Sequence, residues 1–115
     1  MDKKQWPDWE IYKRDRCRCV YCGFDGTIYA NWRQLQIDHL VPRSADPPGS
    51  NDRDNKVVSC AFCNLLKGAY DPREEAASPD HNDLIQQAAK YIYEKGKEYH
   101  EGYVLMMLEL GNDSK

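Results

Sequence analysis

The 115-residue sequence lacks the features of membrane and exported proteins. No apolar run approaches the ~20 residues that a helix needs to cross a bilayer. The first residues carry no hydrophobic stretch of the signal-peptide kind, and internal repeats and low-complexity tracts are absent. We therefore expect a cytoplasmic protein that makes no contact with a membrane.

Large apolar side chains are also scarce. The chain has only two Phe, and 41% of its residues are hydrophobic. A chain of this length buries roughly two-thirds of the surface that it exposes when unfolded, so its core is small. We expect a single domain over residues 1–115 that gains stability from an internal cross-link.

Five cysteines could provide that cross-link. Four of them form two Cys-x-x-Cys pairs, Cys19 with Cys22 and Cys60 with Cys63. Disulfides do not persist in a reducing cytosol, so this spacing predicts a structural zinc ion with four thiolate ligands and no open position. The alternative is a set of four core cysteines without a metal. We interpret Cys17 as a half-buried side chain rather than a ligand.

Charge is unevenly distributed along the chain, whose net charge is −3. Residues 1–68 carry 11 Lys and Arg against 9 Asp and Glu, which gives +2, and residues 69–115 carry 5 against 10, which gives −5. The cysteine-bearing part is therefore mildly basic, with a group at Lys13, Arg14, Arg16 and Arg18. That group is either a solvated face or a phosphate contact. Such a weak field predicts no strong non-specific affinity for DNA.

Local patterns predict short elements followed by a longer helix. The expected elements are a helix over 7–15, strands over 27–30, 34–37 and 56–59, a helix over 61–67 and an amphipathic helix over 80–100. Residues 103–110 continue the apolar pattern as helix or strand. Residues 41–55 are rich in Pro, Asp, Ser, Gly and Asn and predict a long irregular loop, which in a compact domain is usually functional or disordered.

Polar residues between and beside the cysteine pairs are candidates for chemistry. Side chains alternate along a strand, so Asp38 and His39 point to opposite faces unless the strand ends there. Pro42 and the polar loop place both at a strand end, where they can reach a cleft. Asn64 lies on the first turn of a helix whose start the zinc fixes. A hard cation held by Asp38 and Asn64 alone would keep positions open for water and phosphate oxygens.

Three stretches resemble the HNH endonuclease family. They are residues 14–23 (RDRCRCVYCG), 36–42 (QIDHLVP) and 54–68 (DNKVVSCAFCNLLKG). The resemblance covers about residues 10–70 and leaves the C-terminal part outside it. It implies an α+β fold: a small zinc-stabilised ββα-metal domain with a short N-terminal helix, followed by a C-terminal amphipathic helical region over 78–110.

The resemblance also implies roles for individual residues. His39 matches the general base that activates water, and Asn55 matches the central Asn that holds the loop and the histidine. Asp38 and Asn64 match the ligands of one catalytic cation. Asn64 stands where the family often has His, and an amide oxygen favours Mg²⁺ or Mn²⁺ over Zn²⁺. The implied reaction is hydrolysis of DNA phosphodiester bonds, which leaves 5′-phosphate and 3′-hydroxyl ends.

Several contacts and one alternative function stay open. Arg16, Arg18, Arg43 and Arg53 are candidate DNA contacts, and Lys67 is either a phosphate contact or a solvated side chain. The acidic region over 80–110 could form a homodimer, cover the core or mimic DNA. The alternative function is a non-catalytic four-cysteine zinc module that binds nucleic acid or a protein partner. In that case the Asp-His pair merely caps a loop, and the asparagines lie in turns.

Overall fold

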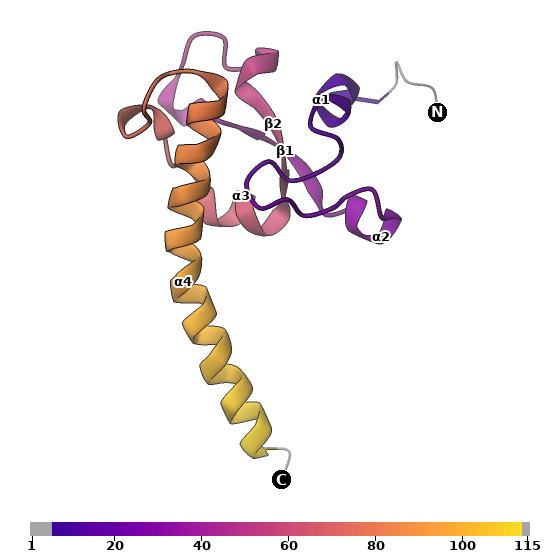
Figure 1. The fold of residues 1–115 in the computed structure, drawn as a ribbon, viewed down its shortest axis with the longest axis vertical. Helices are drawn as coiled ribbons and strands as arrows, with labels where there is room; N and C mark the ends of the chain where they lie inside the picture. The colour runs from indigo at the N-terminus through magenta and orange to yellow at the C-terminus, as the bar shows by residue number, and fades with distance from the viewer. Residues whose placement is uncertain (1–5, 114–115) are drawn as a thin grey trace.

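The computed structural model describes residues 6–113 (Figure 1). In chain order its helices and strands are α1 (Trp9–Arg14), α2 (Tyr29–Trp32), β1 (Leu35–His39), β2 (Lys56–Cys60), α3 (Ala61–Lys67) and α4 (His81–Asp113). Three single-turn 3-10 helices lie between them: η2 (Arg43–Ala45), η3 (Arg53–Asn55) and η4 (Pro72–Glu74). This mixture of helices with a small sheet confirms the predicted α+β class. The predicted domain also includes residues 1–5 and 114–115, which lie outside the described residues.

β1 and β2 form a two-stranded antiparallel sheet, and α3 follows β2 without a break. Leu35 pairs with Cys60 at one end of the ladder, and His39 pairs with Lys56 at the other. Cys60 ends β2 and caps α3, because its sulfur accepts a hydrogen bond from the Cys63 amide. Strand, loop, strand and helix therefore follow one another in the ββα order that the resemblance implied.

The strand predicted over 27–30 is wrong. Thr27 lies in a turn, and Tyr29–Trp32 form the short helix α2. The Asp25 carboxylate accepts hydrogen bonds from both the amide and the hydroxyl of Thr27. An Asp side chain that bonds two residues ahead holds the backbone in a turn, and this local bond outweighs the β propensity of the residues that follow.

The first helix and the sheet share one apolar core. Ile11 is the buried residue of α1, whereas Trp9 is exposed, so the helix turns its Ile11 face inward. Ile11 belongs to a cluster with Leu35, Val58, Leu66 and Ile92, which come from both strands, α3 and α4. A second cluster contains Leu40, Val41, Val57 and Leu84 and lies where the β1–β2 loop begins.

α4 is a single helix of 33 residues. Neither Gly96 nor Gly102 interrupts it, and the segment 103–110, which the sequence left open between helix and strand, is helical. Its first half packs beside α3 and η4, and its second half extends well past the rest of the chain (Figure 1). Among residues 6–113 no helix is apolar enough over a sufficient length to span a membrane.

Candidate metal centre and catalytic site

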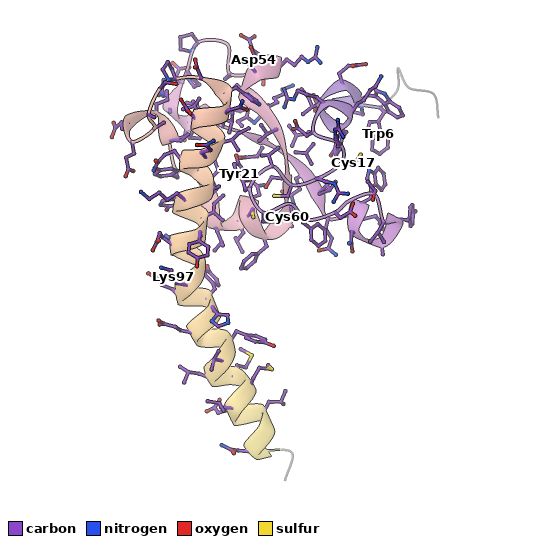
Figure 2. The ribbon with its side chains drawn as sticks, viewed as in Figure 1. Trp6, Cys17, Tyr21, Asp54, Cys60 and Lys97 are labelled. Carbon is purple, nitrogen blue, oxygen red and sulfur yellow. The ribbon has the colours of Figure 1, made fainter. Side chains whose placement is uncertain are left out.

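Four cysteine sulfurs from two separate turns meet at the start of α3. The sulfurs of Cys19, Cys22, Cys60 and Cys63 all lie within 4.8 Å of one another. Those of Cys22 and Cys60 are 3.7 Å apart, and Figure 2 shows Cys60 at the junction between the sheet and α3. Tetrahedral ligation with Zn–S bonds near 2.3 Å would put sulfurs ~3.8 Å apart. The four residues can therefore hold a metal ion, and the spacing fits zinc.

The local backbone positions these thiols. Gly23 ends the first knuckle with a positive φ of 80°, and its amide donates to the Cys19 carbonyl at 2.8 Å. A residue with a Cβ adopts that conformation less readily. Cys17 is half-buried and packs against the core beside the cluster, and it is not one of the four grouped sulfurs. Its placement agrees with the predicted non-ligand role.

In the absence of a metal, hydrogen bonds between the thiols and their burial shift the pKa values of the cysteines in different directions. A hydrogen bond from Cys63 lowers the pKa of Cys19 to about 4, despite the burial of that thiol. The same hydrogen bond, with burial, raises the pKa of Cys63. Burial raises the pKa of Cys22 to about 11. Metal binding to four thiolates would therefore release protons and would weaken as the pH falls.

Asp38 lies on β1 and is almost fully buried at 7% exposure. The hydroxyl of Tyr21 donates a hydrogen bond of 2.6 Å to Asp38 Oδ2, and Lys67 Nζ lies 3.3 Å from the same oxygen. Burial, together with the charge of Asp38, raises the pKa of Tyr21 far above its ordinary value, so this phenol stays a donor. No sequence pattern pointed to Tyr21, because its position inside the knuckle is typical of packing.

Lys67 is placed differently from either predicted alternative. Its side chain is fully buried, pairs with Asp38 and donates a hydrogen bond of 2.8 Å to the His39 carbonyl. A buried ammonium needs partners of this kind. As placed, Lys67 is neither a solvated side chain nor able to reach a DNA phosphate, so that prediction is corrected.

Asn64 faces β1 one helical turn before Lys67. Its amide group donates to Gln36 Oε1. Gln36 and Asp38 are two residues apart and so share one face of the strand, while residues three apart share one face of a helix. Two cross-links thus join β1 to α3, Gln36 with Asn64 and Asp38 with Lys67. Asp38 and Asn64 therefore occupy neighbouring positions along the same contact.

His39 is the last residue of β1 and faces the loop that follows. Its Nε2 lies 3.3 Å from Asn51 Oδ1 and 3.4 Å from Arg43 Nε. Arg43 also donates to Asn51 Oδ1 at 3.2 Å. In the described part of the chain no hydrogen bond or ion pair joins the side chains of His39, Asp38 and Asn64 to one another. Asp38 contacts Tyr21 and Lys67, whereas His39 lies beside Asn51 and Arg43, so the two adjacent side chains have different neighbours.

Asn55 fixes the start and the end of this loop. Its Oδ1 accepts from the Val41 amide at 2.9 Å, and its Nδ2 donates to the carbonyls of Val41 and Ser50 at 3.1 and 3.0 Å. The Asn55 carbonyl also accepts from the Leu40 amide at 2.9 Å. The residue after His39 is therefore tied to the residue before β2.

The predicted arginine contacts are all exposed. Arg43 lies beside His39, Arg53 is on η3, Arg16 follows α1 and Arg18 lies 3.4 Å from Asp25. Arg14, in contrast, is partly buried and forms hydrogen bonds within the chain. Its guanidinium bonds Asp15 and the carbonyls of Arg53 and Lys56, and Asp15 accepts from the Val58 amide. Arg14 and Asp15 therefore join α1 to β2.

The comparison with known families agrees with this geometry. Residues 19–69 match the HNH endonuclease family. They include both cysteine pairs, β1, β2 and α3, so the match supports an HNH-type domain in this part of the chain. No curated protein and no solved structure matches the chain. The HNH domain and the four-cysteine cluster together indicate a nuclease-type protein that binds metal.

Proposed function

We propose that the protein is a metal-dependent endonuclease that hydrolyses DNA phosphodiester bonds. The observation that carries the proposal is the position of Asp38 and His39 at the end of β1, next to a loop that Asn55 ties down, within the segment that matches the HNH family. A phosphate that approaches this end of the strand would meet the imidazole of His39, with the buried Asp38 carboxylate one residue away.

His39 acts as the general base through Nε2. While Nε2 carries no proton it accepts a hydrogen bond from Arg43, and once it has taken a proton from water it can donate to Asn51 Oδ1. The hydroxide so formed attacks phosphorus, and the bond from phosphorus to the 3′ oxygen breaks. Water returns a proton to that oxygen. The products are a 5′-phosphate and a 3′-hydroxyl.

Asp38 and Asn64 would hold the catalytic cation. Asn64 uses its amide nitrogen on Gln36, so its amide oxygen is the atom that can turn toward a cation beside Asp38. Mg²⁺ or Mn²⁺ prefers such oxygen ligands and would neutralise charge at the phosphate and at the departing oxygen. Arg43, with Arg16, Arg18 and Arg53, contacts the DNA backbone. The four cysteines bind zinc, which fixes β2 and α3 and does no chemistry.

A non-catalytic zinc module that binds nucleic acid or protein is the second candidate. The ion pair between Asp38 and Lys67 favours it, since a carboxylate that Lys67 already neutralises attracts a cation less strongly. The two candidates differ in one property. Only the nuclease has a rate of DNA cleavage, and that rate falls when the metal or its ligands are removed.

A cleavage assay separates them. The purified chain is incubated with supercoiled plasmid, single-stranded DNA and base-modified DNA, in Mg²⁺, in Mn²⁺ or in a chelator that leaves the zinc in place. The nuclease cuts at least one substrate with a divalent cation and leaves ends that a ligase rejoins, and Asp38→Asn raises the cation concentration needed for half-maximal rate. Failure to cut any of these substrates with either cation would overturn the proposal.

A further inference from the structure

The inward face of α4 continues beyond the domain against which it packs. Inside the domain this face is formed by Leu84, Ala88 and Ile92, none of which is more than 8% exposed. Residues three and four apart share one side of a helix. At those spacings the same face continues through Gly96, Tyr99, Tyr103, Met106 and Leu110. The continuation has the apolar pattern of a packed face, and from Tyr103 on its side chains are exposed in the described part of the chain.

A hollow of about 940 Å³ lies along this face where α4 leaves the domain. Phe62 of α3 lines it at the domain side, with its ring 6.1 Å from that of Tyr99. Gly96, Gly102 and Met106 line the helix side. A Cβ at Gly102 would meet no atom within 4 Å. The hollow is therefore open to another helix at close approach.

We infer that α4 of a second copy of this chain fills the hollow, packed antiparallel so that Tyr99 of each copy lies level with Tyr103 of the other. This register sets Met106 of the second copy against Gly96, so that a long side chain meets the smallest residue at both ends of the contact. Gly102 of the two copies then lies near the two-fold axis, where the absence of a side chain lets the backbones approach.

Charge selects the direction of the pair. In the antiparallel register Lys95 of each copy flanks the contact opposite Glu109 of the other, and the two-fold symmetry makes this ion pair twice. A parallel pair would place Lys95 level with Lys95 and Glu109 level with Glu109 and would form neither ion pair. Lys95 and Glu109 thus complement each other when the helices run in opposite directions.

Exposed apolar side chains are concentrated at the C-terminal end of α4. Residues 103–110 carry seven large exposed hydrophobic side chains: Tyr103, Val104, Leu105, Met106, Met107, Leu108 and Leu110. Soluble monomers rarely expose so continuous an apolar patch. Of these side chains, Tyr103, Met106 and Leu110 lie on the continued face, where Tyr99 and Phe62 extend the apolar surface toward the domain.

Sedimentation velocity of the full chain over a micromolar concentration series tests the inference. We expect a species of twice the 13.4 kDa chain mass. Met106→Glu sets a carboxylate in the apolar contact and should raise the dissociation constant about tenfold or more. Leu108→Glu is the matched control, because Leu108 is 62% exposed against 63% for Met106 and lies on the other side of the helix. It should leave the dissociation constant unchanged.

Charge reversal tests the direction. Lys95→Glu and Glu109→Lys should each weaken the dimer, and an equimolar mixture of the two variants should restore it. Circular dichroism checks that every variant keeps its helix. A monomer at all concentrations would overturn the inference, as would a Leu108→Glu variant that dissociates as readily as Met106→Glu. If Lys95→Glu and Glu109→Lys each dimerise as tightly as the wild type, the antiparallel register is overturned. None of these readouts depends on nuclease activity.

Discussion

Lys67 and Asp38 form an ion pair at 3.3 Å in which the lysine side chain is fully buried and the aspartate side chain is only 8% exposed. The pair joins the last turn of α3 to β1, one residue before His39. The same lysine holds the His39 carbonyl. A single buried ammonium thus fixes both residues of the Asp-His pair that the proposed reaction uses.

Removal of Lys67 should therefore cost stability. We expect Lys67→Met to lower the free energy of unfolding by about 3 kcal/mol, because it leaves the Asp38 carboxylate buried without a cation. Urea unfolding measures the change. The double variant Lys67→Met with Asp38→Asn removes both charges and should recover most of the loss. A Lys67→Met protein as stable as the wild type would show that the pair contributes nothing.

Tyr21 should govern stability at high pH. Its folded-state pKa lies above its ordinary value of 10.0 because the phenol is buried beside Asp38. The unfolded chain then loses this proton near pH 10 while the folded chain keeps it, so the stability from the shift is complete below that pH and declines above it. Unfolding free energies above pH 10 should fall more steeply for the wild type than for Tyr21→Phe. Parallel curves would contradict this prediction.

Asn55 should matter for both the loop and the reaction. Asn55→Ala deletes three hydrogen bonds to Val41 and Ser50, at a net cost of about 2 kcal/mol in unfolding free energy. Because the loop also positions His39, we expect cleavage to slow by about 100-fold. Asn51→Ala is the control for stability, since Asn51 is exposed and its side chain bonds the exposed Arg43 and His39 rather than the backbone of the loop. Equal destabilisation by both variants would refute the special role of Asn55.

Loss of zinc should unfold the domain. Cys60→Ser removes a ligand and the cap of α3, and structural zinc contributes on the order of 10 kcal/mol in comparable small domains. We expect metal analysis to find about one zinc per wild-type chain, and circular dichroism to show no cooperative unfolding for Cys60→Ser. Cys17→Ser should keep both the metal and the fold. A Cys60→Ser protein with wild-type melting would contradict the structural role.

Local sequence patterns predicted most of the fold. The cysteine spacing and the patterns that predicted strands over 34–37 and 56–59 and a helix over 61–67 depend on neighbours in sequence, and the sheet, α3 and the metal cluster agree with them. The prediction of a strand over 27–30 failed because two hydrogen bonds from Thr27 to the Asp25 side chain hold that turn, and β propensity does not include such bonds.

The details of the candidate site depend on distant partners. Burial of Lys67 follows from Asp38, which lies on another element, and Tyr21 reaches the same carboxylate from the knuckle. A residue type and its spacing do not reveal such a contact. The length of α4 was equally open, because the apolar pattern over 103–110 fits a helix or a strand and the sequence names no tertiary contact that would decide between them.

The most direct test of the central claim compares His39→Ala with the wild type on a DNA substrate that the wild type cuts. Both proteins are matched for zinc content and assayed with Mg²⁺ or Mn²⁺ under single-turnover conditions. We expect His39→Ala to bind the DNA with unchanged affinity and to cleave it at least ~100-fold more slowly. Cleavage by His39→Ala at the wild-type rate would contradict the assignment of His39 as the base.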